Sequence, residues 1–184
     1  MSSDAKRASR AAPNVGKPRD VIPKLATEIA HLDPGSAAAL RRDPLDAAAF
    51  WRLLAKHNPA GSEDHWAALV QAIAILTPKG RKREKRPAHN PERSMGEALQ
   101  VAGVSELRLA RLLGAPPGLR PEVAIRTCRR LAATEASRFN LVTLGQFLLF
   151  GADKRPARWI ARDYYQAAFA ALRKPQDKET STNA

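Results

Sequence analysis

The chain has 184 residues, 44% of them hydrophobic, which is enough for one ordinary domain or for two small helical lobes. Lys and Arg number 31 against 18 Asp and Glu, a formal net charge of +13. No apolar run approaches the roughly 20 residues that span a bilayer, no secretory signal is visible, and one cysteine cannot form an intramolecular disulfide. We therefore expect a cytoplasmic protein that does not associate with a membrane.

The charge is the most informative part of the composition. Most of the excess remains when residues 25–175 are counted alone, so it belongs mainly to the part of the chain that is expected to fold. A basic folded surface attracts polyanions, and nucleic acid is the commonest polyanion in a cytoplasm. The charge therefore favours nucleic-acid binding, with a basic protein that lacks a specific partner as the alternative.

The first part of the chain reads as a disordered arm followed by an N-terminal helical lobe. Residues 1–20 are basic and lack a hydrophobic period, so we expect disorder there. Residues 21–78 are predicted to form the lobe. Its four helices are expected over 23–31, over 36–42, after an Asp46 cap with Phe50, Leu53 and Leu54 facing inward, and from a Ser62 cap to the stop at Pro78.

Residues 79–93, KGRKREKRPAHNPER, are interrupted by prolines and hold no large apolar residue. Such a segment predicts a long mobile linker loop between two lobes. Its basic residues are candidates for contact with nucleic acid: Lys79, Arg81, Lys82, Arg83 and Lys85.

Residues 94–174 are predicted to form a C-terminal helical lobe, before a disordered tail over 175–184. Ser94 and Glu97 have the spacing of a capping box, and Gly103 is placed to end that helix. The next helices are expected from Ser105 to Leu113, from Pro121 through Cys128, from an Asn140 cap to Gly151, and from Asp153 with Trp159, Ile160, Tyr164 and Leu172 inward.

Alanine and leucine dominate the apolar residues and no segment reads convincingly as a strand, so the predicted fold class is all-α, with two small helical lobes joined by a long basic loop. The three tryptophans, Trp51, Trp66 and Trp159, fall at inward positions of their helices. We therefore interpret them as core residues and not as a platform for stacked bases.

The residues that carry common enzyme chemistry are scattered. His31, His57, His65 and His89 do not pair with other ligands at zinc spacing, and Cys128 lies on the apolar side of its helix. No phosphate-binding Gly-rich loop and no serine nucleophile elbow is present, and the carboxylates lie mostly in first turns of helices. We expect no enzymatic activity, no metal and no cofactor.

The basic residues, in contrast, form groups along predicted helices, with few acids at the spacing that would pair with them. Contacts from such groups to phosphates would position a strand without reading its sequence. Outside the loop, the candidate residues for nucleic-acid binding are Arg41, Arg42, Arg108, Arg111, Arg126, Arg130, Lys154, Arg155 and Arg158.

Several segments resemble the CasB family, the small subunit of the type I-E CRISPR surveillance complex, Cascade. They are DPGSAAALRRDPLDAAAFWRLLA (33–55), SMGEAL (94–99), VSELRLARLL (104–113) and LLFGADKRPARWIARDYY (148–165). The resemblance runs in order over residues 25–172 and includes the basic loop between the two predicted lobes.

The resemblance implies a non-catalytic, all-helical protein of antiviral defence. Two copies would pack head to tail along the inner side of the complex, beside the other Cascade subunits and near the guide RNA and target strand. Their basic surface would hold the displaced non-target DNA strand of the R-loop. Carried over by motif, Arg42, Arg108, Lys154, Arg155 and lysines of the 79–86 stretch would contact its backbone. Asp64 stands where some relatives have a base.

Two other classes of function remain open at this point. A free-standing DNA- or RNA-binding regulator would present a recognition helix, and the helix pair over 94–113 imitates a helix-turn-helix, although its second helix offers mainly Leu and Arg. A structural assembly protein would use the same basic face to meet an acidic protein partner.

Overall fold

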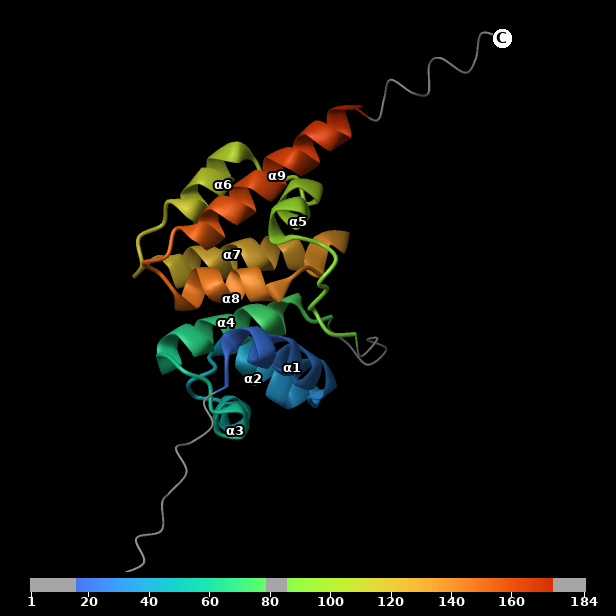
Figure 1. Ribbon diagram of the computed structural model, residues 1–184. Coiled ribbons are helices and arrows are strands. Elements are labelled where there is room, and N and C mark those ends of the chain that lie inside the picture. The colour runs from blue at the N-terminus through green and yellow to red at the C-terminus, as the bar shows by residue number, and fades with distance from the viewer. Residues whose placement is uncertain (1–15, 79–85, 174–184) are drawn as a thin grey trace, which may run out of the picture.

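The computed structural model describes residues 16–78 and 86–173, and the regular elements in these ranges are helices (Figure 1). Extended backbone pairs there only in two isolated bridges, Gly16 with Pro59 and His89 with Phe139. The predicted all-α class is confirmed. The helices are α1 (Pro18–His31), α2 (Pro34–Arg42), α3 (Ala48–His57), α4 (Glu63–Leu76), α5 (Met95–Val101), α6 (Glu106–Leu113), α7 (Arg120–Ala132), the 3₁₀ turn η1 (Glu135–Ser137), α8 (Leu141–Leu149) and α9 (Arg155–Arg173).

Helix α1 begins before Pro23, so both the predicted start at 23 and the predicted boundary of the disordered arm at 20 are wrong. Pro23 inside the helix costs about 3 kcal/mol. Val21 and Ile22 are buried, and each contributes about 1.5–3 kcal/mol by leaving water. Their burial offsets the proline. Residues 1–15 of the predicted arm and 174–184 at the other end lie outside the described residues.

The two halves of the chain share one core, so the prediction of two lobes with separate cores is not what the structure has. Helix α4 is buried on nearly all sides, and it packs against α1 and α2 on one side and against α7 and α8 on the other. One continuous cluster of buried side chains contains Ile22 and Phe50 from the first half and Leu131 and Ile160 from the second. A helix that is apolar all round needs neighbours on every side, and only both halves together supply them.

The second part of the predicted linker is anchored, contrary to expectation. Ala88 is fully buried, and its carbonyl accepts a hydrogen bond from the amide of Phe139 at 3.2 Å. The amide of Asn90 donates to the Phe139 carbonyl at 2.9 Å, and His89 Nδ1 accepts from the first amide of α8, that of Leu141, at 3.2 Å. Two backbone hydrogen bonds and one to an imidazole anchor the segment, so it needs no large apolar side chain.

Helices α5 and α9 approach closely because α5 carries Gly96. A methyl group added there would overlap the backbone carbonyl of Ile160 and the backbone amide of Tyr164. The Tyr164 hydroxyl donates to the Val104 carbonyl at 2.6 Å, which ties α9 to the start of α6. Beyond these contacts the last turns of α9 project past the other helices (Figure 1), and Leu172, predicted to face inward, is 72% exposed.

The predicted caps are partly confirmed. The side chains of Ser94, Asn140 and Asp153 accept hydrogen bonds from backbone amides at the starts of α5, α8 and α9. Asp46 does not cap α3, because a turn in which the Ala47 amide donates to the Pro44 carbonyl moves the start to Ala48. Ser62 and Ser105 hold the cap positions of α4 and α6 without a hydrogen bond from the side chain.

Candidate nucleic-acid interface

Four of the predicted arginines meet across a groove between α6 and α7. Arg108 and Arg111 come from α6, and Arg126 and Arg130 come from α7. The groove has a volume of about 250 Å³, and its other lining residues are Val104, Val123 and Thr127. We call this set of four arginines and their groove the arginine groove.

The amphipathic pattern of each helix puts these arginines on the outside. Helix α6 buries Leu109 and Leu112, and α7 buries Ala124, Cys128 and Leu131 at helical spacing. The remaining faces of the two helices then carry the arginines, and the packing of α6 against α7 brings the two pairs to one groove. The neighbouring Arg129 points elsewhere, into a hollow at the end of α4.

The arginine groove is electrostatically unbalanced. Arg126 forms an ion pair with Glu122, and Arg130 donates to the Gly103 carbonyl at 3.2 Å. The side chains of Arg108 and Arg111 form no ion pair or hydrogen bond with another described residue, and both are exposed. Guanidinium groups stay charged at any physiological pH, so the four positive charges of the groove repel one another, and only the Glu122 carboxylate is paired with one of them among the described residues. An anion such as a phosphate would relieve that repulsion.

A second basic group lies at the turn between α8 and α9. Asp153 accepts hydrogen bonds from the Arg155 guanidinium at 2.9 and 3.1 Å, and these bonds lower the pKa of the Asp153 carboxyl below its ordinary value. The charge of Arg155 is therefore partly neutralised within the protein. Lys154 and Arg158 are exposed and form no ion pair with a described residue, so they are the cations that this turn offers to a ligand.

Arg41 and Arg42 belong to a different part of the surface from the arginine groove. They end α2, which packs on the far side of α4 from α7 (Figure 1). The half-buried Arg41 donates from Nε to the Ala74 carbonyl at 2.8 Å, which satisfies one of the last carbonyls of α4. Arg41 thus has a structural task, whereas Arg42 is exposed. The candidates Lys79, Arg81, Lys82, Arg83 and Lys85 lie outside the described residues.

The prediction that all three tryptophans are core residues is wrong for two of them. Trp66 is 1% exposed, but Trp51 is 42% and Trp159 is 38% exposed. In α9 the buried stripe is Pro156, Ile160 and Tyr164, and Trp159 lies beside it. Phe150, 49% exposed, precedes the same helix. We missed these aromatic residues as surface candidates, although the alternation of aromatic and basic residues in FGADKRPARW was the available signal.

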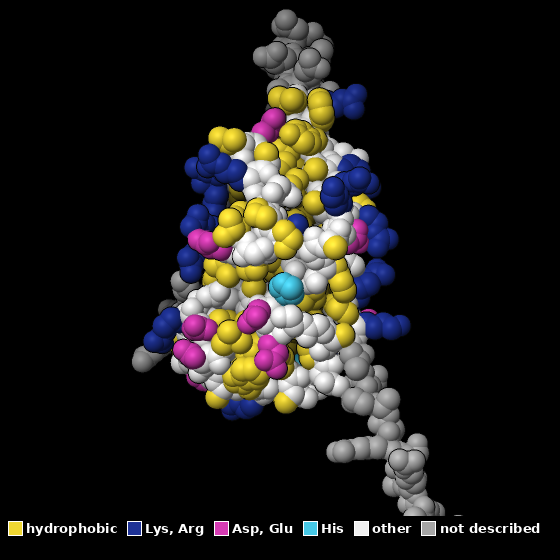
Figure 2. All heavy atoms as spheres, turned by 90° about the vertical axis from the view of Figure 1, so that its left-hand side faces the viewer, with side chains coloured by type: hydrophobic (Ala, Val, Ile, Leu, Met, Phe, Trp, Pro, Cys, Tyr) yellow, Lys and Arg dark blue, Asp and Glu magenta, His cyan; other side chains and the backbone are white. Residues whose placement is uncertain are grey.

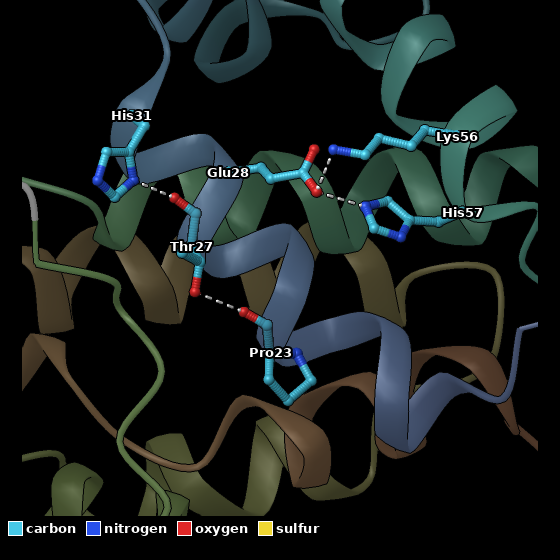
Figure 3. A network of polar contacts seen from close by, with 6 residues as sticks. All are labelled: Pro23, Thr27, Glu28, His31, Lys56 and His57. Atoms are coloured by element: carbon cyan, nitrogen blue, oxygen red, sulfur yellow. Dashed lines mark hydrogen bonds and ion pairs between the residues drawn. The ribbon is translucent and has the colours of Figure 1, made fainter.

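The other polar features of the structure hold helices together. Glu28 of α1 accepts from His57 Nε2 at 2.8 Å and from Lys56 Nζ at 3.0 Å, which joins α1 to α3 (Figure 3). Partial burial raises the pKa of Glu28, but these two hydrogen bonds outweigh it, so the net pKa is lowered. Cys128 is fully buried as predicted, and burial raises the pKa of its thiol to about 12.

Across the described ranges, no three His, Cys, Asp or Glu side chains gather in a way that could hold a metal ion. None of the helices described is long and apolar enough to cross a membrane.

Figure 2 shows how the charged side chains are distributed over one face of the molecule. Lys and Arg side chains line both edges of its upper part with hydrophobic side chains between them, and most acidic side chains lie lower.

Comparison with known proteins does not assign the chain to a family. None of the family models matches it, and a search of curated proteins found no match either. The arginine groove and the turn between α8 and α9 therefore have to be interpreted from their own chemistry.

Proposed function

We propose that this protein is a non-catalytic, nucleic-acid-binding subunit of a type I-E Cascade complex, and that it stabilises the R-loop by holding the displaced DNA strand. The observation that carries the proposal is the arginine groove, in which Arg108 and Arg111 lack protein partners among the described residues. The resemblance of the segments 104–113 and 148–165 to the CasB family supplies the context, because the first contains Arg108 and Arg111 and the second contains the basic turn between α8 and α9.

The physical requirements of R-loop formation agree with this arrangement. Replacement of a DNA duplex by an RNA–DNA heteroduplex is nearly balanced in free energy, so modest contacts to the freed strand shift the equilibrium. These contacts have to be indifferent to sequence, because the target changes with the guide. Arginines directed at phosphates meet that requirement.

The test is the affinity of the full chain for single-stranded DNA of several unrelated sequences, measured over a salt series. The double variant Arg108→Ala/Arg111→Ala should weaken binding by a similar factor for every sequence. Each lost phosphate contact should flatten the salt dependence by about 0.7 in the logarithmic slope. Arg52→Ala is the matched control, since Arg52 is an exposed arginine on α3 and should leave both quantities unchanged.

Assembly is tested in parallel, by co-purification of the chain with type I-E Cascade subunits and a guide RNA produced in the same cells. Losses that depend on target sequence would favour a free-standing regulator that reads bases. Salt-sensitive binding to an acidic protein without affinity for DNA would favour a structural assembly protein. Either result would contradict the proposed function.

A further inference from the structure

A cavity of about 670 Å³ lies between the end of α8 and the start of α9. Two exposed aromatic side chains, Phe150 and Trp159, line it. The other lining residues are Gln146, Leu149, Gly151, Ala152, Asp153, Arg155 and Pro156. Large aromatic side chains normally leave water, and here two of them face one cavity. The cavity is therefore a candidate for an apolar, planar ligand.

The indole of Trp159 differs from the other two indoles in its hydrogen bonding. Trp51 Nε1 donates to the Leu45 carbonyl at 2.8 Å, and Trp66 Nε1 donates to the Ala60 carbonyl at 2.9 Å. Trp159 Nε1 has no hydrogen-bond acceptor among the described residues. Its ring is thus neither fully buried in the core nor fixed by a polar contact, and its exposed part is available to a ligand.

The charges around the cavity identify the chemistry of that ligand. Arg155 is the cation that lines the cavity, and it is paired with Asp153. Lys154 lies between these two lining residues in the chain and Arg158 directly precedes Trp159, and neither of these exposed cations forms an ion pair with a described residue. Asp153, the acid at the cavity, is already engaged by Arg155. An aromatic cavity beside two available cations matches a nucleotide unit, with a planar base for the rings and phosphates for the cations.

The packing of the turn keeps the cavity open. Arg120 Nη1 donates to the Gly151 carbonyl at 2.8 Å and to the Phe147 carbonyl at 3.4 Å, which fixes the end of α8 and the turn after it. Because the turn is already fixed, binding of a base costs less conformational entropy than it would if the base had to order a mobile loop.

We propose that this cavity receives an unpaired base of a single strand, which stacks on Trp159 and Phe150 while its flanking phosphates meet Lys154 and Arg158. This inference rests on the proposed function and deepens it, because it makes the protein selective for single strands. Bases in a duplex are already stacked and paired, so they cannot enter. Every base has a flat aromatic face, so the site stays indifferent to sequence.

The experiment compares two probes of equal charge with the full chain: a 12-nucleotide oligodeoxythymidine and an abasic sugar–phosphate strand of the same length. The natural protein should bind the intact strand about tenfold more tightly, and this strand should quench tryptophan fluorescence. Trp159→Leu should remove both the preference and the quenching while leaving the salt slope unchanged. Trp51→Leu, the matched control on α3, should retain the preference and the quenching.

Base stacking in the cavity and phosphate binding by the cations can be refuted separately. Equal affinity for both probes with a normal salt slope would overturn the base site and leave phosphate binding in place. Absence of binding to either probe at low salt would overturn both. If Trp159→Leu shows no cooperative thermal unfolding, Phe150→Leu takes its place, since Phe150 is half exposed and its loss should reduce the preference in the same direction.

Discussion

Arg120 shows how a single residue can be basic without belonging to the interface. Its guanidinium donates to the carbonyls of Phe147, Gly151 and Ala115, and it lies over the Phe147 ring at 4.8 Å. Its Nε is buried and has no hydrogen-bond partner among the residues that the structure describes. The planar fork presents donors to carbonyls after α6 and at the end of α8, whereas the ammonium of lysine is a compact point charge without that fixed fork.

We therefore predict that Arg120→Met destabilises the fold by about 2–3 kcal/mol, because buried carbonyls lose a charged donor. Arg120→Lys should recover only part of this loss. The measurement is urea unfolding at neutral pH. Arg126→Met, a change of the same kind at an exposed position, should remain within about 0.5 kcal/mol of the natural protein. Equal effects at both positions would contradict the structural role of Arg120.

At the scale of elements, Gly96 sets how closely α5 packs on α9. In an isolated helix, Gly→Ala stabilises by about 1 kcal/mol. Here the added methyl group would overlap backbone atoms of α9, which cannot move aside as the end of a side chain can.

Gly96→Ala should accordingly destabilise the protein by about 1–3 kcal/mol, the usual cost of overpacking. Thermal unfolding of this variant is compared with Gly118→Ala, where an added methyl group meets no neighbour. A more stable Gly96→Ala variant would show that α5 and α9 are not in close contact.

The segment over 86–93 and helix α8 are joined by His89, whose Nδ1 has to be unprotonated to accept from the Leu141 amide. Burial lowers the pKa of His89 below its ordinary 6.5, so the folded protein binds this proton more weakly than the unfolded chain does. The stability that neutral His89 provides is complete above pH 6.5 and is lost as the pH falls below that value.

Unfolding free energies measured between pH 8 and pH 5 should therefore fall more steeply for the natural protein than for His89→Gln. The other histidines are present in both proteins, so the difference between the two curves reports His89 alone. Parallel curves would mean that His89 does not accept this hydrogen bond.

For the whole molecule, the start of α1 decides where the fold begins. The Gly16 amide donates to the Asn58 carbonyl at 3.1 Å, and the carbonyl of Lys17 accepts the first hydrogen bonds of α1. Val21 and Ile22 then enter the core that both halves share.

Deletion of residues 1–20 should therefore lower the midpoint of thermal unfolding relative to deletion of residues 1–15, because it removes the Gly16 contact and the first turn of α1. A loss of about 1–2 kcal/mol would correspond to partial exposure of Val21 and Ile22 when the first turn is removed. Identical midpoints for the two truncated chains would place the start of the fold after residue 20.

Much of the secondary structure follows from the sequence alone. The apolar spacing and the caps at Ser94 and Asn140 indicated the helices of the second half, and the composition indicated an all-α protein. The buried state of Cys128 followed from its place on an apolar face. These are local properties, decided by residues within one or two turns of each other.

Only the tertiary structure decided which surfaces meet. Periodicity places Arg108 and Arg126 on the outer faces of their helices, but the packing of α6 on α7 determines that the two faces share a groove. Periodicity also places Trp159 beside the apolar stripe of α9, but whether the indole is covered depends on how far the neighbouring helices extend. Pro23 likewise suggested a helix start, and burial of Val21 and Ile22 outweighed it. In each case the contact joins residues far apart in the chain, and spacing within one helix carries no information about them.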